Sequence, residues 1–126
     1  MEFANMNWLA VIVGAVVGFL VGWLFYSPIL FGKKWAEGSG VTLNTADKMP
    51  AQAMITQFLA LLALSIVVGV TATANALLTA IFAILAAALF VASNGGFCKK
   101  SGYAILVDFG YICVAGVIMI IAQGLF

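Results

Sequence analysis

The residue best suited to chemistry in this sequence is Asp108, an acid inside the apolar stretch YAILVDFGYICV, which runs from residue 103 to 114. An aspartate at the centre of a membrane helix costs about 3 kcal/mol, so such a residue is expected to have a partner or a function. Small residues share its helical face: Ala104, Ala115 and Ala122, with Tyr111 one turn on. This pattern predicts that Asp108 points into a helix bundle.

Three ways of compensating the buried charge of Asp108 stay open. The carboxylate could pair with a lysine that reaches inward from a helix end. The candidate lysines are Lys33, Lys34, Lys99 and Lys100. Asp108 could instead accept hydrogen bonds from hydroxyl or amide groups, or be protonated, because burial disfavours the charged form of a carboxyl group. The predicted buried polar cluster consists of Asp108, Tyr26, Ser27, Asn94 and Tyr111.

Other catalytic or cofactor chemistry finds few candidate residues. The sequence has no histidine and two cysteines, Cys98 and Cys113, so a zinc or haem site lacks its usual ligands. A catalytic site would also need a nucleophile or a general base with an orienting partner. We therefore expect no metal, no cofactor and no enzymatic activity. The net charge of +1 argues against a nucleic-acid partner, which would need clustered basic residues.

The composition is that of a membrane protein. Of 126 residues, 66% are hydrophobic and 7% are charged, whereas about a quarter of a soluble domain is charged. Apolar runs long enough to span a bilayer occupy about residues 7–31, 51–72, 75–93 and 103–125, with polar loops at 32–50 and 94–102. We expect one all-α membrane domain over residues 1–126, a compact bundle of four transmembrane helices. Asn75 is expected to cap the third helix.

The lysines predict the orientation of this bundle. Lys33, Lys34 and Lys48 follow the first span, and Lys99 and Lys100 follow the third, so all five fall on one side of the membrane. The positive-inside rule places that side in the cytoplasm, so both termini are expected outside. The residues expected to anchor the chain at this interface are Lys33, Lys34, Trp35, Lys99 and Lys100.

Three glycines form a stripe on the first span. Gly14, Gly18 and Gly22 recur every four residues and so lie on one helical face. In lipid, small residues at this spacing let two helices approach closely and pack. The stripe predicts either packing against another helix of the same chain or an interface between subunits.

Two segments resemble a known bacterial family, the domain of unknown function numbered 1761, which consists of small four-span membrane proteins. They are MNWLAVIVGAVVGFLVGWLFYSPILFGKKW, residues 6–35, and DFGYICVAGVIMIIAQG, residues 108–124. The resemblance implies a four-span fold in the inner membrane and supplies no established activity, so it implies no catalytic residue. It also implies that the family pattern includes Tyr26, Ser27, Pro28, Phe31, Gly32, Trp35 and Asp108.

Two classes of function follow from these features. The first is an interaction protein that acts through helix–helix assembly, as a homo-oligomer or as an accessory subunit of a larger membrane complex. The glycine stripe and the short loops favour it. The alternative is a small oligomeric transporter or channel, coupled to protons or cations through Asp108, although no inverted repeat is evident. The expected partners are the lipid bilayer and further membrane subunits.

Overall fold

The computed structural model describes residues 5–27, 29–40 and 51–126, and over these residues the chain is all-helical. The helices are α1 (Trp8–Phe25), α2 (Gly32–Ser39), α3 (Ala51–Thr73), α4 (Leu77–Phe97) and α5 (Gly102–Leu125). All except α2 are long and apolar enough to cross a bilayer. The protein is therefore a multi-pass, all-α membrane protein, as its composition predicts.

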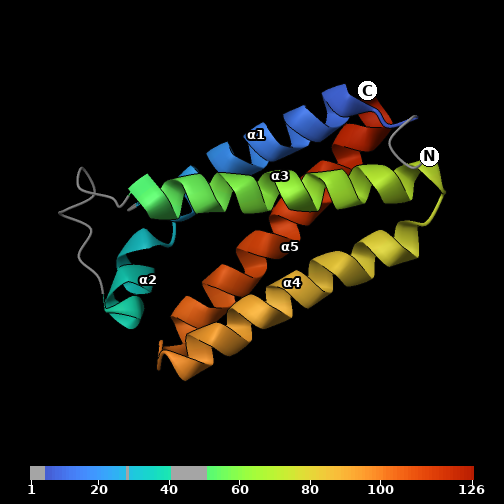
Figure 1. The fold of residues 1–126 in the computed structure, drawn as a ribbon. Coiled ribbons are helices and arrows are strands. Elements are labelled where there is room, and N and C mark those ends of the chain that lie inside the picture. Colours follow the sequence, from blue (N-terminus) through green and yellow to red (C-terminus); the bar gives the residue numbers. More distant parts are fainter. Residues whose placement is uncertain (1–4, 28, 41–50) are drawn as a thin grey trace.

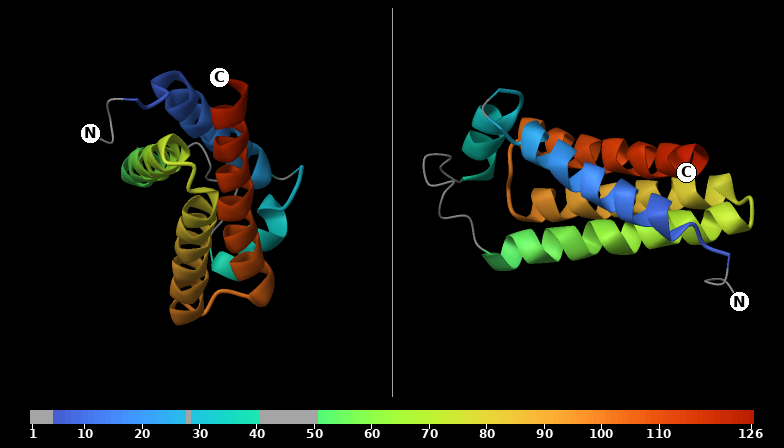
Figure 2. Two further views of the ribbon diagram at one scale, coloured as in Figure 1. Left: turned by 90° about the vertical axis from the view of Figure 1, so that its right-hand side faces the viewer. Right: turned by 90° about the horizontal axis from the view of Figure 1, so that it is seen from above.

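The central helix of the bundle is α5, which packs against all four other helices and most extensively against α1. α1 begins and α5 ends at one end of the bundle, beside the turn between α3 and α4 (Figure 1). α2 and the connection from α4 to α5 lie at the opposite end, where the four described lysines are found. We call this the lysine end. α3 and α4 diverge from their turn toward the lysine end (Figures 1 and 2).

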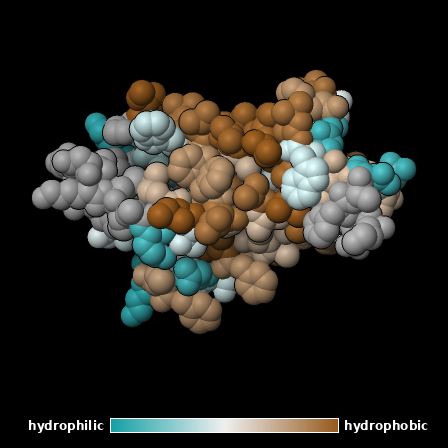
Figure 3. Space-filling model, turned by 45° about the horizontal axis from the view of Figure 1, so that its top comes forward, coloured by the Kyte–Doolittle hydropathy of each residue, from teal (hydrophilic) through white to brown (hydrophobic). Residues whose placement is uncertain are grey.

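The outer surface of the bundle is apolar between its two ends. Figure 3 shows a face covered mostly by hydrophobic side chains, with hydrophilic ones gathered toward the ends. Large apolar side chains are exposed on several helices, among them Trp23, Phe82 and Phe90. Extended apolar surface of this kind marks contact with a membrane or another protein.

The glycine stripe of α1 is buried inside the chain. A Cβ atom on Gly14 would lie 3.0 Å from Ser65 Oγ of α3, and one on Gly22 would lie 2.6 Å from Tyr111 Oη of α5. A Cβ atom on Gly18 would meet the nearest neighbouring atom at 3.6 Å. The stripe thus packs against α3 and α5 of the same chain. Of the two uses predicted for the stripe, the structure shows packing within the chain, where Gly14, Gly18 and Gly22 are all buried.

Polar side chains inside the bundle bond to the α1 backbone. Ser65 Oγ donates to Val11 O at 2.7 Å, and Tyr111 Oη donates to Gly18 O at 2.7 Å. Each carbonyl has a second lone pair beyond its helical bond, so these side chains are satisfied without water. The buried apolar cluster around them consists of Leu61, Val68, Ile84, Tyr111, Ala115 and Met119.

The first helix ends inside the apolar run predicted at about residues 7–31. α1 stops at Phe25, and the hydroxyl of Ser27 donates to Leu24 O at 2.7 Å, which satisfies a carbonyl of the last turn. The chain then turns into α2, where a predicted loop forms a helix instead. Gly32 is required there, because a Cβ atom would lie 2.6 Å from Ser27 O. Pro28 and Lys48, which entered the predictions, lie outside the described residues.

Asn75 ends one helix and does not cap the next. Its φ is 52°, and the N–H groups of Asn75 and Ala76 donate to Ala72 O and Thr71 O at 3.3 and 2.8 Å. This is a Schellman motif at the end of α3, in which asparagine tolerates the left-handed conformation. The N-cap of α4 is Ala76, without a side-chain hydrogen bond, so the predicted capping by Asn75 is wrong.

Candidate functional site

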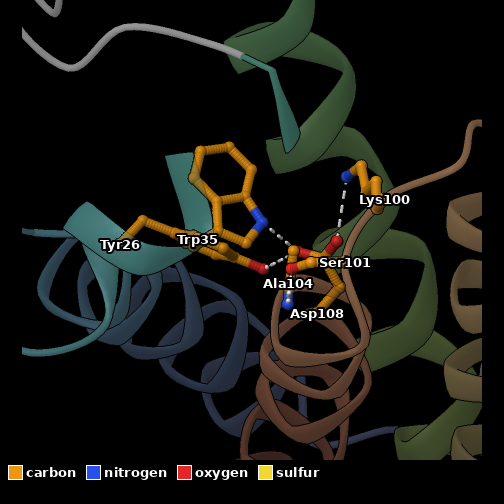
Figure 4. A network of polar contacts seen from close by, with 6 residues as sticks. All are labelled: Tyr26, Trp35, Lys100, Ser101, Ala104 and Asp108. Carbon is orange, nitrogen blue, oxygen red and sulfur yellow. Dashed lines mark hydrogen bonds and ion pairs between the residues drawn. The ribbon is translucent and has the colours of Figure 1, made fainter. Parts of the chain in front are cut away.

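Asp108 lies in the second turn of α5, near the lysine end, and is 7% exposed. Its carboxylate accepts three side-chain hydrogen bonds (Figure 4). Tyr26 Oη and Trp35 Nε1 donate to Oδ1 at 2.6 and 2.9 Å. Lys100 Nζ donates to Oδ2 at 2.9 Å and forms an ion pair. These four residues are called the Asp108 cluster below.

Tyr26 enters the cluster from the C-cap of α1. Its ring packs edge-on against Trp35 and Tyr111, with centroids 4.8 and 5.6 Å apart. Burial, and then the hydrogen bond to Asp108, raise the pKa of the Tyr26 hydroxyl. The Tyr26 hydroxyl therefore stays neutral and donates the hydrogen bond to Asp108.

Trp35 enters from α2 with its indole N–H directed inward. The sequence predicts an interface anchor at this position. Trp35 is partly exposed at the lysine end, and its Nε1 is bonded to Asp108, a partner that the sequence did not predict. α2 itself is held beside α5 by a backbone bond from Ser101 N to Gly38 O at 2.9 Å.

Lys100 enters from the connection between α4 and α5. α4 ends in a second Schellman motif, in which Lys99 has a φ of 59° and Lys100 N donates to Gly95 O at 3.0 Å. The turn directs Lys100 back toward Asp108, and its Nζ also lies 5.4 Å from the centre of the Trp35 ring. Lys100 was expected both as an anchor and as a possible partner of Asp108, and it is placed as the partner.

The donor set suits an ionised carboxylate. An ionised carboxylate only accepts hydrogen bonds, and all three partners are donors. Hydrogen bonds to charged groups are shorter and stronger than those between neutral groups, and the ammonium of Lys100 offsets the carboxylate charge. The cluster joins the end of α1, the helix α2, the α4–α5 connection and α5 through a single side chain.

Three residues of the predicted cluster are placed elsewhere. Ser27 bonds to Leu24 O. Asn94 is exposed and lies on α4, which continues past the predicted end at residue 93 to Phe97. Tyr111 is buried and packs edge-on against Tyr26, but its hydroxyl bonds to Gly18 O. Of the residues predicted to surround Asp108 in the buried polar cluster, only Tyr26 bonds to its carboxylate. The predicted places of Ser27 and Asn94 in that cluster are therefore corrected.

Trp35 is the functional partner that the sequence did not reveal. A tryptophan N–H usually finds an acceptor when it is buried, and Asp108 is the one acid predicted inside a span. These two observations together could have predicted a bond between Trp35 and Asp108. The prediction was missed because Trp35 follows Lys33 and Lys34, a pattern typical of an interface anchor. Those two lysines and Lys99 are exposed at the lysine end.

The Asp108 cluster lies at the lysine end, and packed side chains of α5 separate it from the far end of the bundle. A cavity of about 310 Å³ lies at that far end, among residues of α3, the α3–α4 turn, α4 and α5 such as Thr71, Asn75 and Gln123. Between it and the cluster, α5 presents the buried side chains of Tyr111, Ala115 and Met119. Within the described residues, no group of three His, Cys, Asp or Glu side chains could hold a metal ion.

Comparison with known proteins identifies the family and nothing more specific. The family described as "Protein of unknown function (DUF1761)" matches residues 9–124. No curated protein and no solved structure matches the chain. The match includes all four residues of the Asp108 cluster and nearly the whole bundle. The chain therefore belongs to the DUF1761 family, whose function is unknown.

Proposed function

We propose that this protein acts through helix–helix assembly in the inner membrane, as a homo-oligomer or as an accessory subunit of a larger membrane complex. The observation that carries the proposal is the Asp108 cluster. The acid of the fourth span accepts bonds from Tyr26, Trp35 and Lys100 and so holds the chain's own segments together. Its polar chemistry stabilises the fold, which leaves the helix surfaces as the parts that can contact other molecules.

The alternative, a transporter or channel coupled through Asp108, has less support. Coupling requires an acid that exchanges protons or cations along a polar path. Asp108 is paired with Lys100 at 2.9 Å, and the side chains of Tyr111, Ala115 and Met119 occupy the α5 face beyond it. A path would have to form between copies of the chain.

The outer face of α4 is the surface proposed for assembly. Only 17% of its spanning window is buried inside the chain, compared with 39% for α5. The large apolar side chains exposed on α4 include Ile81, Phe82, Leu85, Leu89 and Phe90. Because α4 packs mainly on α5 and meets α3 near their shared turn, most of this face is free to contact another helix.

The test is the native mass of the particle after gentle extraction from its own membrane, with every component identified. A particle with several copies, or with other proteins in fixed ratio, is expected. Ala86, exposed on α4, offers a disruptive variant, Ala86→Trp, and Ala63, exposed on α3, offers the matched control Ala63→Trp. Loss of the larger particle in Ala86→Trp alone supports the α4 face. A wild-type monomer contradicts the proposal.

We further propose that the lysine end faces the cytoplasm, following the positive-inside rule. Cys98 is exposed at this end, whereas Cys113 lies within α5. A membrane-impermeant maleimide should therefore label Cys98 only after the cells are permeabilised. Labelling of intact cells would mean that the lysine end faces the outside of the cell. Cys98→Ser is the control that identifies Cys98 as the labelled site.

A further inference from the structure

An apolar groove lies at the lysine end, on a face of α5 other than that of Asp108. Its volume is about 180 Å³, and its lining comprises Phe25, Phe31, Tyr103, Leu106, Val107 and Gly110. An apolar cavity of about 150 Å³ holds one benzene molecule, so this groove has room for a short length of hydrocarbon chain.

Two walls form the groove. Four of its residues, at positions 103, 106, 107 and 110 of α5, recur at the spacing of one helical face. The opposite wall is the pair Phe25 and Phe31, whose ring centroids are 4.9 Å apart. A Cβ atom on Gly110 would have no neighbouring atom within 4 Å, so a larger side chain can be introduced at this position of the groove without a clash.

A positive charge is fixed at the mouth of the groove. Lys34 Nζ lies 5.0 Å from the ring centre of Tyr103, and Tyr103 is itself part of the groove. Lys33 and Lys34 are both exposed, and neither forms an ion pair with Glu37 or Asp108, the acids in the described part of the chain. An apolar slot below an exposed lysine complements a molecule with an acyl chain and an anionic head.

The groove also lies at the depth where such a molecule occurs. Tyr103 is in the first turn of α5, at the end of a spanning helix, where tyrosine and lysine meet lipid headgroups. From Tyr103 to Gly110 the groove extends about 10 Å along the helix axis at 1.5 Å per residue, into the region of the acyl chains. Leu106, on its edge, is 67% exposed, so the groove opens to the bilayer.

We propose that this groove binds one anionic phospholipid of the bilayer. The phosphate of the lipid lies at Lys34, with Lys33 nearby. Part of one acyl chain lies between the α5 face and the rings of Phe25 and Phe31. Lipid of any charge fits the apolar wall, and the lysines provide the preference for an anionic head. This inference uses neither an oligomer nor the Asp108 cluster, so it stands apart from the function proposed above.

The test is lipid binding to the purified full-length protein in a non-ionic detergent, measured by native mass spectrometry. The two probes are dioleoyl phosphatidylglycerol and dioleoyl phosphatidylcholine, which share acyl chains and differ in head charge. Tighter binding of phosphatidylglycerol is expected. Lys34→Gln should lower this preference about fivefold, the effect of one lysine near an anionic lipid surface. Lys99→Gln, which removes an exposed lysine away from the groove, should leave the preference unchanged.

A second pair of variants tests the acyl-chain part of the site. Gly110→Leu fills the groove and should weaken both lipids by a similar factor, so that their ratio is preserved. Gly96→Leu is the matched control, because a Cβ atom at this helical glycine also meets open space and Gly96 is outside the groove. If Gly110→Leu does not fold, the comparison of Lys34→Gln with Lys99→Gln still decides.

Several results would overturn the proposal. Equal affinity of the wild type for the two lipids would remove the anionic site. Equal effects of Lys34→Gln and Lys99→Gln would indicate attraction by the whole surface. Unchanged lipid binding in Gly110→Leu would show that the groove is not the binding place. If that variant instead lost a larger particle, a second copy of the chain would be the occupant.

Discussion

Replacing single glycines of the α1 stripe by alanine should have very different effects at neighbouring positions. A Cβ atom on Gly22 would lie 2.6, 2.7 and 2.9 Å from Oη, Cζ and Cε1 of Tyr111, closer than carbon contacts allow. One turn earlier, a Cβ atom on Gly18 would meet its nearest neighbours at 3.6 and 3.7 Å, which is ordinary van der Waals contact. Gly18→Ala is therefore the matched control for Gly22→Ala.

The magnitude follows from what Tyr111 would lose by moving. It is 2% exposed, its hydroxyl donates to Gly18 O at 2.7 Å, and its ring packs on Phe25 and Tyr26 at 5.8 and 5.6 Å. Overpacking a core costs about 1–3 kcal/mol, and the lost hydrogen bond about 1 kcal/mol. Alanine regains about 1 kcal/mol of helix propensity over glycine. Gly22→Ala should therefore destabilise the fold by about 1–3 kcal/mol.

The same sum predicts the control. Gly18→Ala meets no close contact and keeps the gain in propensity, so its stability should be unchanged or higher by up to about 1 kcal/mol. Gly14→Ala should fall between the two, because its Cβ atom would meet Ser65 Oγ at 3.0 Å and Met119 Cα at 3.3 Å. The expected order of destabilisation is Gly22, then Gly14, then Gly18.

The assay is the free energy of unfolding in mixed micelles, titrated with sodium dodecyl sulfate and followed by far-ultraviolet circular dichroism. The reasoning is refuted if Gly18→Ala destabilises the protein as much as Gly22→Ala. It is also refuted if the effects depend on protein concentration, because that dependence would mean that the stripe packs between copies.

Three further predictions concern the Asp108 cluster, all measured with the same unfolding assay. Trp35→Phe keeps an aromatic ring but removes the N–H that bonds to Asp108, so it should cost about 2 kcal/mol. The control Trp23→Phe, at a tryptophan that is 72% exposed, should cost little. Equal effects of the two variants would contradict the bond from Trp35 to Asp108. Lys100→Met leaves the carboxylate without its ion pair and should cost about 2 kcal/mol, less than for a fully buried pair, whereas Lys99→Met should be neutral; a neutral Lys100→Met would remove the ion pair from the account. Combining Lys100→Met with Asp108→Asn should destabilise by less than the sum of the single effects, with a coupling of about 1–3 kcal/mol, and strict additivity would show that the two side chains do not interact.

The composition and the order of apolar runs determined the fold class and the approximate spans. Hydrophobicity is a local property that needs only a length and a sum, so four spanning helices follow without any knowledge of their packing. Local signals failed where two of them competed at one residue. Asn75 could cap the helix after it or end the helix before it, and the left-handed φ of 52° shows that it ends α3.

The helical periodicity of α5 also determined which face of that helix is buried. Ala104, Ala115 and Ala122 are buried with Asp108, as their shared face predicts. Periodicity describes one helix at a time, however, and says nothing of which other helix covers the face. For the same reason the three glycines of α1 could be recognised as a packing stripe, but not assigned to packing within the chain.

The partners of Asp108 were decided by the tertiary structure alone. The sequence offered four lysines and several hydroxyl and amide groups, all near enough along the chain or across the bundle to reach the acid. Lys100 contacts Asp108 because the Schellman turn after α4 directs its side chain back toward α5. Trp35 contacts Asp108 because α2 packs beside the start of α5. A hydrogen bond requires a narrow range of distance and angle between donor and acceptor. The sequence does not give the distance between Trp35 and Asp108, which are 73 residues apart, so only the packing of the helices determines that they bond.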